Sequence, residues 1–305
     1  MDISITDENV VASHLQAPYH RSQLLVTWTM RWVHDAERVS VGMAPRLDLL
    51  GTGNAFLPRG RFHSMALVDG IHLIDASPTA LASLRRAGRS PAHLRSVLVT
   101  HTHGDHVFGF PFLLLERRYI SDREGLHPLT VVGAPGVEER LRSLCALAYP
   151  GSLDALLDQV TFLTSQTGML EGGWTYEMFE VHHDAATVPH GYSLRHVDGA
   201  SVVHGGDTGP CASFEGAVAG AALTVVEMGV PEWVPTEHHH RPSDVVALAE
   251  RHPDVRFAVT HTFVDDDGPG PVTVTADEPQ MPANVHLSSD GDAWEWDGME
   301  WTLLQ

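Results

Sequence analysis

Three histidines and one aspartate stand within six consecutive residues of this 305-residue chain. They form the segment His101-Thr102-His103-Gly104-Asp105-His106, which directly follows an apolar run. Imidazole nitrogens and carboxylate oxygens are ligands that zinc and related divalent ions take in proteins. His101 and His103 leave an extended segment on the same side, because side chains two residues apart share a face. Asp105 and His106, beyond the glycine, point toward a second position, so the segment predicts a cradle for two adjacent metal ions.

Further donors of the same kind recur at the ends of later predicted strands. His182 and His183 follow one strand, Asp207 follows another, and His261 ends a third. A solvent-exposed loop that happens to be rich in histidine would leave this recurrence unexplained. Loops at strand ends are where ligands bind in open α/β sheets, so we expect these residues to converge on one site.

The order of several segments resembles the metallo-β-lactamase superfamily, and within it the branch of ribonuclease Z-like phosphodiesterases. The resemblance covers roughly residues 46–263. The segments are LLGTGNAFLPRGRFHS, HLIDASP, VTHTHGDHVFGFP, VVHGGDTGP, VVEMG and AVTHT. The resemblance implies an α/β fold, the αββα four-layer sandwich. It also implies two divalent metal ions at the sheet edges, usually Zn²⁺, with Mn²⁺ or iron as alternatives.

The same resemblance implies a set of seven metal ligands. One ion would be held by the first two histidines of the motif and a third histidine later in the chain. The other ion would be held by the aspartate and the last histidine of the motif and by a histidine near the end of the domain. A further aspartate would bridge both ions. The set is His101, His103, His183, Asp105, His106, His261 and, as the bridge, Asp207. His183 is preferred for the later histidine because it is in phase with the preceding strand, and His182 and His190 remain alternatives.

The chemistry implied is hydrolysis by a hydroxide that bridges the two ions, with a glutamate-supported histidine as proton donor to the leaving group. Asp105, Glu227 and His240 are therefore the predicted catalytic residues. His240 is preferred because a helical pattern begins directly after it, as in the resembling family. His238 and His239 remain alternatives for the donor.

Charge and segment length restrict the substrate. The formal net charge is −20, and the 19 basic residues are all Arg. Fifteen of them lie in residues 1–142 with 14 acids, whereas residues 143–305 hold four with 25 acids. A polyanion such as nucleic acid meets long-range repulsion from such a chain. A small anion could still be attracted near the arginine-rich half.

Comparison with tRNA-processing members of the resembling family also argues against a large substrate. Residues 149–173 are too short for the glycine- and proline-rich arm that grips tRNA, and they contain no basic residue. The strand end at residues 75–78 also differs from the family pattern. We expect a small, anionic phosphodiester. Alternatives are a lactone, β-lactam, thioester or sulfate ester, tRNA 3′ processing, and a mononuclear iron oxygenase on the same fold.

Strands alternate with helical patterns from residue 46 to residue 261, which predicts one α/β domain over residues 45–264. Residues 1–44 form an extension whose aromatic side chains suggest a homodimer contact. Residues 265–305 are expected to contain an acidic loop, a strand at 272–277 and a second strand near 293–301, which together would form a terminal hairpin or a lid-like appendage. Two distant cysteines and the lack of a membrane-spanning or leader pattern favour a cytoplasmic protein without membrane contact.

Overall fold

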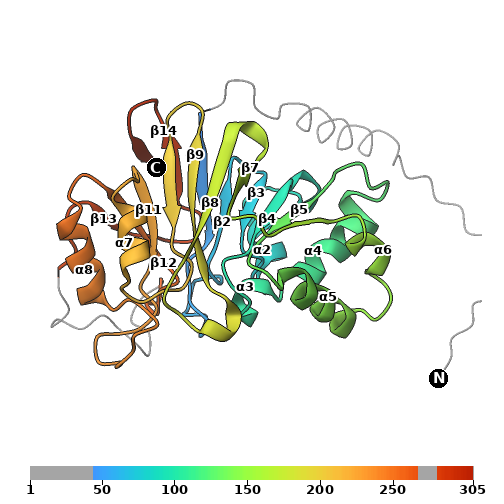
Figure 1. Cartoon of the computed structure of the whole chain (residues 1–305), viewed down its shortest axis with the longest axis horizontal. Helices are drawn as coiled ribbons and strands as arrows, with labels where there is room; N and C mark the ends of the chain where they lie inside the picture. Colours follow the sequence, from blue (N-terminus) through green and yellow to red (C-terminus); the bar gives the residue numbers. More distant parts are fainter. Residues whose placement is uncertain (1–43, 267–279, 305) are drawn as a thin grey trace, which may run out of the picture. The chain divides into compact units, whose positions relative to one another are not determined.

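The structure is a computed structural model that describes residues 44–266 and 280–304. The predicted N-terminal extension, apart from its last residue, lies outside the described residues, and so does the strand predicted at 272–277. The described part contains two mixed β-sheets that pack face to face, with helices on their outer sides (Figure 1).

The first sheet has eight strands in the order β15-β14-β1-β2-β3-β4-β5-β6. Its strands are β1 (Arg46–Gly51), β2 (Met65–Val68), β3 (His72–Ile74), β4 (Ser96–Leu98), β5 (Thr130–Val132), β6 (Thr161–Leu163), β14 (Ala293–Trp296) and β15 (Trp301–Leu304). The pairs from β3 to β6 are parallel, and the others are antiparallel.

The second sheet has seven strands in the order β13-β12-β11-β10-β9-β8-β7. Its strands are β7 (Thr167–Met169), β8 (Trp174–Glu180), β9 (His190–His196), β10 (Ser201–His204), β11 (Leu223–Glu227), β12 (Arg256–Thr260) and β13 (Val285–Leu287). The pairs from β10 to β13 are parallel, which brings the carboxyl ends of these strands to one edge of the sheet.

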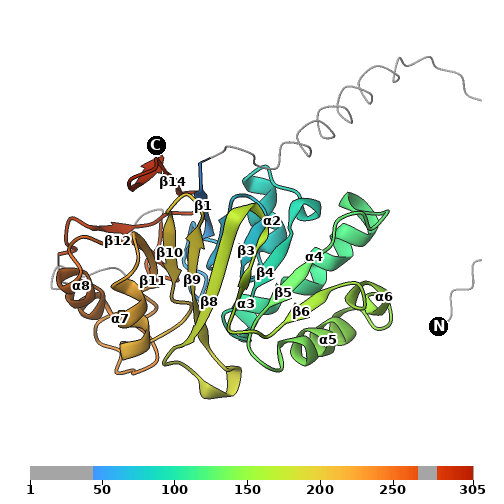
Figure 2. The same ribbon diagram turned by 45° about the horizontal axis from the view of Figure 1, so that its top comes forward.

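Helices cover the outer side of each sheet (Figures 1 and 2). On the first sheet these are α2 (Ala80–Arg86), α3 (Gly104–Val107), α4 (Phe110–Glu116), α5 (Val137–Ala148) and α6 (Asp154–Leu157), and on the second α7 (Ala212–Val218) and α8 (Pro242–Arg251). Short helical turns occupy Pro91–His93, Arg117–Ser121, Glu171–Gly173 and Ala185–Thr187. Every helix of the described ranges is too short or too polar to span a lipid bilayer.

Alternating side chains of the central strands divide the core into three layers. Val202 packs between the sheets, whereas its neighbour Val203 packs under α7 and α8. Leu98 and Val97 of β4 divide in the same way between the inter-sheet layer and the layer under α4. A period of two along buried strands therefore builds the helix–sheet–sheet–helix order that the sequence predicted.

The C-terminal hairpin is part of the first sheet, which corrects the expectation of an appendage over residues 265–305. β14 pairs with β1, and β15 pairs with β14. Trp294, Trp296 and Trp301 join the layer between the sheets. The indole Nε1–H of Trp301 donates to the carbonyl of Ser201 in the opposite sheet at 3.0 Å. The sequence pattern predicted a single strand near residues 293–301, where the structure has the two strands β14 and β15. It did not show their partner β1, because that strand lies far away in the chain.

We predict that Trp301→Ala lowers the free energy of unfolding by about 3–5 kcal/mol, because it leaves a cavity between the sheets and removes the bond to Ser201. Urea denaturation followed by tryptophan fluorescence and circular dichroism measures this. Met299 lies in the same hairpin and is 87% exposed, so Met299→Ala is the matched control and should change stability by less than about 0.5 kcal/mol. Equal stability of the two variants would contradict an integral hairpin.

Candidate metal centre

The seven predicted ligands lie in loops that follow four strands at one edge of the two sheets. The motif from His101 to His106 follows β4 and enters α3, and His183 follows β8. Asp207 follows β10, and His261 comes directly after β12. The structure groups their side-chain nitrogen and oxygen atoms into two neighbouring clusters.

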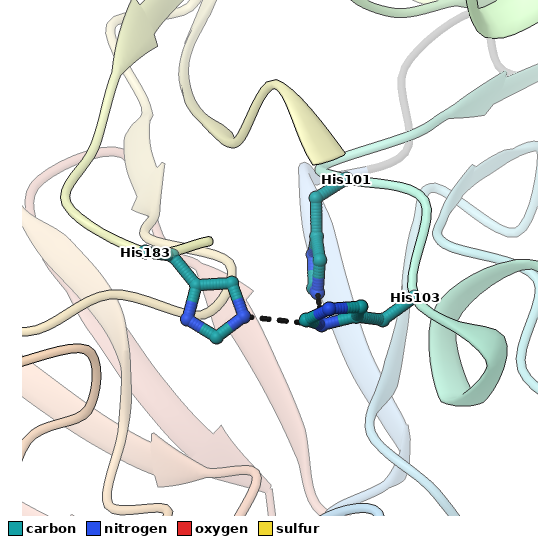
Figure 3. Close-up of side chains that lie close together, drawn as sticks. All are labelled: His101, His103 and His183. Atoms are coloured by element: carbon teal, nitrogen blue, oxygen red, sulfur yellow. Dashed lines mark hydrogen bonds between the residues drawn. The ribbon is translucent and has the colours of Figure 1, made fainter. Parts of the chain in front are cut away.

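The first cluster consists of three imidazoles, His101, His103 and His183 (Figure 3). His103 Nδ1 lies 3.1 Å from His101 Nε2 and 3.1 Å from His183 Nε2. The rings meet nearly edge to face, with interplanar angles of 78–84°. Two nitrogens that share a tetrahedral zinc ion at about 2.0–2.1 Å each are about 3.3 Å apart. The observed spacing therefore fits one ion of this size.

The second cluster consists of Asp105, His106, Asp207 and His261. Asp105 Oδ2 lies 3.3 Å from His106 Nε2 and 3.2 Å from His261 Nε2. Asp207 Oδ1 lies 3.4 Å from His106 Nε2, and Asp207 Oδ2 lies 3.2 Å from His261 Nε2. Asp207 Oδ2 is also 3.8 Å from His101 Nε2 of the first cluster. Asp207 therefore lies between the two clusters, where the sequence predicted a bridge.

Three side-chain atoms of the second cluster are buried without a hydrogen-bond partner among the described residues. One is His261 Nδ1, and the other two are His106 Nε2 and Asp207 Oδ1, which face each other. Buried polar atoms without partners are costly and rare. A divalent cation between His106 Nε2 and Asp207 Oδ1 would satisfy both atoms, so the donor chemistry of this cluster fits a metal ion. The ligand roles of all seven residues remain a prediction.

Hydrogen bonds on the far side of the rings aim one nitrogen of His101, His103, His183 and His106 into the clusters. His101 Nδ1 bonds to Thr100 Oγ1 at 3.1 Å, His103 Nε2 to Asp184 Oδ2 at 3.3 Å, His183 Nδ1 to the carbonyl of His238 at 3.0 Å, and His106 Nδ1 to Asp75 Oδ2 at 2.8 Å. Such outer partners fix the tautomer of metal-binding histidines. Burial also lowers the pKa of His101 and of His183, which keeps these rings in the neutral form that binds metal.

Asp75 connects the two clusters from behind. Its carboxylate accepts the bond from His106 and bonds from the backbone N–H and the hydroxyl of Thr100, each at 2.8 Å. Thr100 in turn accepts from His101, so this one buried carboxylate orients a ligand in each cluster. Asp75 was noted in the sequence only as an altered strand end. Its position after a buried strand, like that of the other donors, was the available signal.

Gly109 allows the strand end that carries Asp75 to approach the start of α4. A Cβ at Gly109 would lie 1.9 Å from the carbonyl oxygen of Ser77. The backbone N–H of Gly109 instead donates to the carbonyl of Ala76 at 2.8 Å. Asp75 itself has a positive φ of 63°, and His261 has one of 45°. Strained backbone of this kind clusters at functional sites.

The histidine that pairs with Glu227 is not the one expected from the sequence. Glu227 pairs with His239 and not with His240: His239 Nδ1 lies 2.7 Å from Glu227 Oε1. His240 is buried, and its Nδ1 donates to the carbonyl of Thr208 at 2.6 Å. The side chains of adjacent residues point in different directions. Within a run of three histidines, a difference of one position therefore decides whether the ring faces Glu227 or the backbone of Thr208. Burial alone would lower the pKa of His239, but the Glu227 carboxylate outweighs it and raises the pKa to about 9.

The histidine run is held close to Asp207 by Gly209. A Cβ at Gly209 would lie 1.8 Å from the carbonyl oxygen of Glu237, so only glycine lets these two loops touch. The donor atoms of His239, His183 and Asp207 lie within 4.8 Å of one another. The alternative ligands His182 and His190 belong to none of the donor clusters found in the described ranges.

The residues of this site lie within a segment of the chain that matches a known protein family. A family model described as a beta-lactamase superfamily domain matches residues 72–262, more than half of the chain. The chain belongs to the beta-lactamase superfamily. Its predicted αββα fold is thereby confirmed, and it is a hydrolase of the metallo-β-lactamase fold, which implies binding of divalent metal.

Similar proteins include a ribonuclease Z and solved structures of the same fold. A ribonuclease Z of Mycobacterium sp. (strain KMS) is 28% identical over 228 residues, which cover 67% of this chain and 79% of that protein. The short form of human tRNase Z has a TM-score of 0.59 at 19% identity, covering 81% of this chain and 98% of that one. A diphosphatase of the PhnP family has a TM-score of 0.60 at 19% identity, with 83% and 98% covered.

We predict that Asp75→Asn weakens zinc binding by about 10- to 100-fold, because an amide holds His106 and Thr100 less firmly than a carboxylate does. Competition with a chromophoric chelator measures this without any substrate. Asp69→Asn is the matched control, since Asp69 also has a positive φ but bonds to Arg46 and Trp174. Unchanged affinity in the Asp75 variant would show that it does not support the metal centre.

Proposed function

We propose that this protein is a dinuclear metal-dependent hydrolase of a small phosphodiester, with zinc as the metal. The observation that carries the proposal is the position of Asp207 between two separate donor clusters, each of which offers three further protein ligands. A single-ion enzyme, such as a mononuclear iron oxygenase, would leave one buried cluster without a cation. Imidazole and carboxylate donors at these spacings suit zinc.

Two bound ions would lower the pKa of a shared water toward about 7 and offset negative charge on a phosphoryl oxygen. The protein's own contribution is to hold the donors rigidly. His101, His103 and His183 bind on one side, and Asp105, His106 and His261 on the other. Asp75 keeps one histidine of each group in the correct tautomer. No serine or cysteine nucleophile is required.

The departing oxygen of the substrate needs a proton, and we assign this step to His239, with Glu227 as its positioning residue. Glu227 is fully buried and also accepts bonds from the backbone N–H of Thr208 and of Gly229. It holds His239 Nδ1, which leaves Nε2 free. The His239 side chain is 24% exposed, so a substrate can reach it, whereas buried His240 offers no such access.

Charge and structure both favour a small substrate over tRNA. Residues 149–173 form α6, β6, β7 and a helical turn, and thereby the edges of both sheets, so this region does not project as an arm. The net charge of −20 repels a long polyanion. Cleavage of a tRNA precursor is the second candidate, supported by the ribonuclease Z relative.

Purified protein should contain about two zinc ions per chain, and Asp105→Ala should lose about one of them together with most of its activity, because each cluster needs its carboxylate. Metal analysis by mass spectrometry measures the first result. A substrate panel with added zinc or manganese measures the second. It includes bis(p-nitrophenyl) phosphate, cyclic nucleotides, a tRNA precursor, a lactone, a β-lactam, a thioester and a sulfate ester.

Two outcomes would contradict the proposal. One is a metal content well below two ions with full activity in the Asp105 variant. The other is turnover of carbonyl or sulfate esters without any phosphodiester, which would keep the metal centre but change the substrate class. Preferential cleavage of the tRNA precursor would favour the second candidate.

We also predict that His239→Gln lowers kcat by about 10²- to 10⁴-fold for a phosphodiester with an alkyl leaving group, which needs a proton. The loss should be small for p-nitrophenolate, which leaves without one. His238→Gln is the matched control, because this neighbouring imidazole is exposed. Equal losses on both substrates would instead indicate that His239 contributes to metal binding.

A further inference from the structure

A cavity of about 330 Å³ opens beside the first metal cluster. Its lining comes from the loop after β4, the start of α5, and the loop between β8 and β9. His101 belongs both to this lining and to the first cluster. In Figures 1 and 2, α3, the start of α5 and the β8–β9 loop lie at the same edge of the molecule. A ligand in the cavity would therefore lie next to a group bound at the metal cluster.

The lining of the cavity combines apolar and polar side chains. The walls include Val99, Ala134, Val137 and Val188. Exposed polar side chains of α5, namely Glu139, Arg140 and Ser143, complete the lining. Their side chains form no hydrogen bond or ion pair with another residue in the described part of the chain. A guanidinium, a carboxylate and a hydroxyl together offer both donors and acceptors to a ligand.

Val188 gives an independent sign that this wall is built for a ligand. It has a positive φ of 50°, a conformation that a β-branched residue rarely adopts. Strain of this kind marks ligand-binding segments. The same loop carries Asp184, which bonds to His103 of the metal cluster. The strained loop thus contacts the metal cluster and the cavity at once.

We propose that this cavity binds the nucleobase of the phosphodiester substrate, with Arg140 and Ser143 as residues that determine specificity. The inference rests on the proposed function and names its substrate class, a small nucleotide. An aromatic heterocycle has apolar faces for the valine walls and an edge of donors and acceptors for Arg140, Glu139 and Ser143. A second phosphate or a carboxylate would leave the apolar walls uncovered and would be repelled by Glu139. The volume lies within the range of about 300–1,000 Å³ for small-molecule sites.

The test compares two p-nitrophenyl phosphodiesters that share the leaving group and differ only in the second ester group, which is a nucleoside in one and a methyl group in the other. One is thymidine 5′-(p-nitrophenyl phosphate), and the other is methyl p-nitrophenyl phosphate. We expect the zinc-loaded enzyme to show at least about 10-fold higher kcat/KM for the nucleoside ester, since binding of a remote group contributes to transition-state stabilisation. Arg140→Ala should lower this value about 10-fold, mainly through KM, and should change the methyl ester less than about 2-fold.

Arg85→Ala is the matched control, because Arg85 is an exposed arginine on α2, away from the cavity lining. It should leave both substrates unchanged. Val188→Gly relieves the backbone strain and removes one wall, so it should weaken the nucleoside preference without lowering stability. Equal kcat/KM for the two esters, or equal losses for both in Arg140→Ala, would overturn the proposal.

A binding measurement separates this inference from the proposed function. If neither ester is hydrolysed, calorimetry on the zinc-loaded protein compares adenosine 5′-monophosphate with ribose 5-phosphate. The nucleotide should bind at least about 10-fold more tightly than ribose 5-phosphate, and Arg140→Ala should remove this difference. That result would support the base site even though the hydrolytic proposal had failed. Equal binding of the two ligands would overturn the base site.

Discussion

The structure depends on the burial of more metal-type donors than the protein's own hydrogen bonds can satisfy. His106 Nε2 and Asp207 Oδ1 face each other in the interior without hydrogen-bond partners among the described residues. An uncompensated arrangement of this kind would destabilise the fold, and a cation is the simplest compensation. The positions of the strand ends, the second layer of hydrogen bonds and the strained residues all serve to hold these donors together.

The two sheets supply the rigidity that such a centre requires. Donors from β4, β8, β10 and β12 meet only if both sheets keep their relative position, and the aromatic layer between the sheets fixes it. Trp301 contributes packing and a bond from one sheet to the other. At the edge, the Asp75 carboxylate orients a histidine in each cluster: His106 directly and His101 through Thr100. A displacement of this one carboxylate would therefore change the position of a ligand in both clusters.

The loops around the centre divide the remaining tasks. The loop before α8 brings His239 to the metal edge, where buried Glu227 holds it in one tautomer. The start of α5 and the β8–β9 loop form a cavity that His101 also lines. In the proposed function, the acidic charge of the molecule disfavours long polyanions, while Arg140, from the arginine-rich half, binds a small ligand.

The sequence by itself determined the fold class, the alternation of strands and helices between residues 46 and 261, and the division of the motif from His101 to His106 into two groups. These features follow from local spacing: the periodicity of apolar residues along strands and helices, and side chains that leave a loop in alternate directions. The placement of the C-terminal hairpin beside β1 was not predictable, because strand pairing depends on residues far apart in the chain. The support that Asp75 gives to His106 and Thr100 was not predictable for the same reason. It depends on the close contact between the strand end that carries Asp75 and Gly109 at the start of α4. Tertiary structure also decided that His239 and not His240 meets Glu227, because adjacent rings in a run of identical residues point in different directions and only the folded loop shows which one faces the carboxylate. Spacing along the chain thus fixes which donors exist, whereas tertiary packing decides which partner each of them meets.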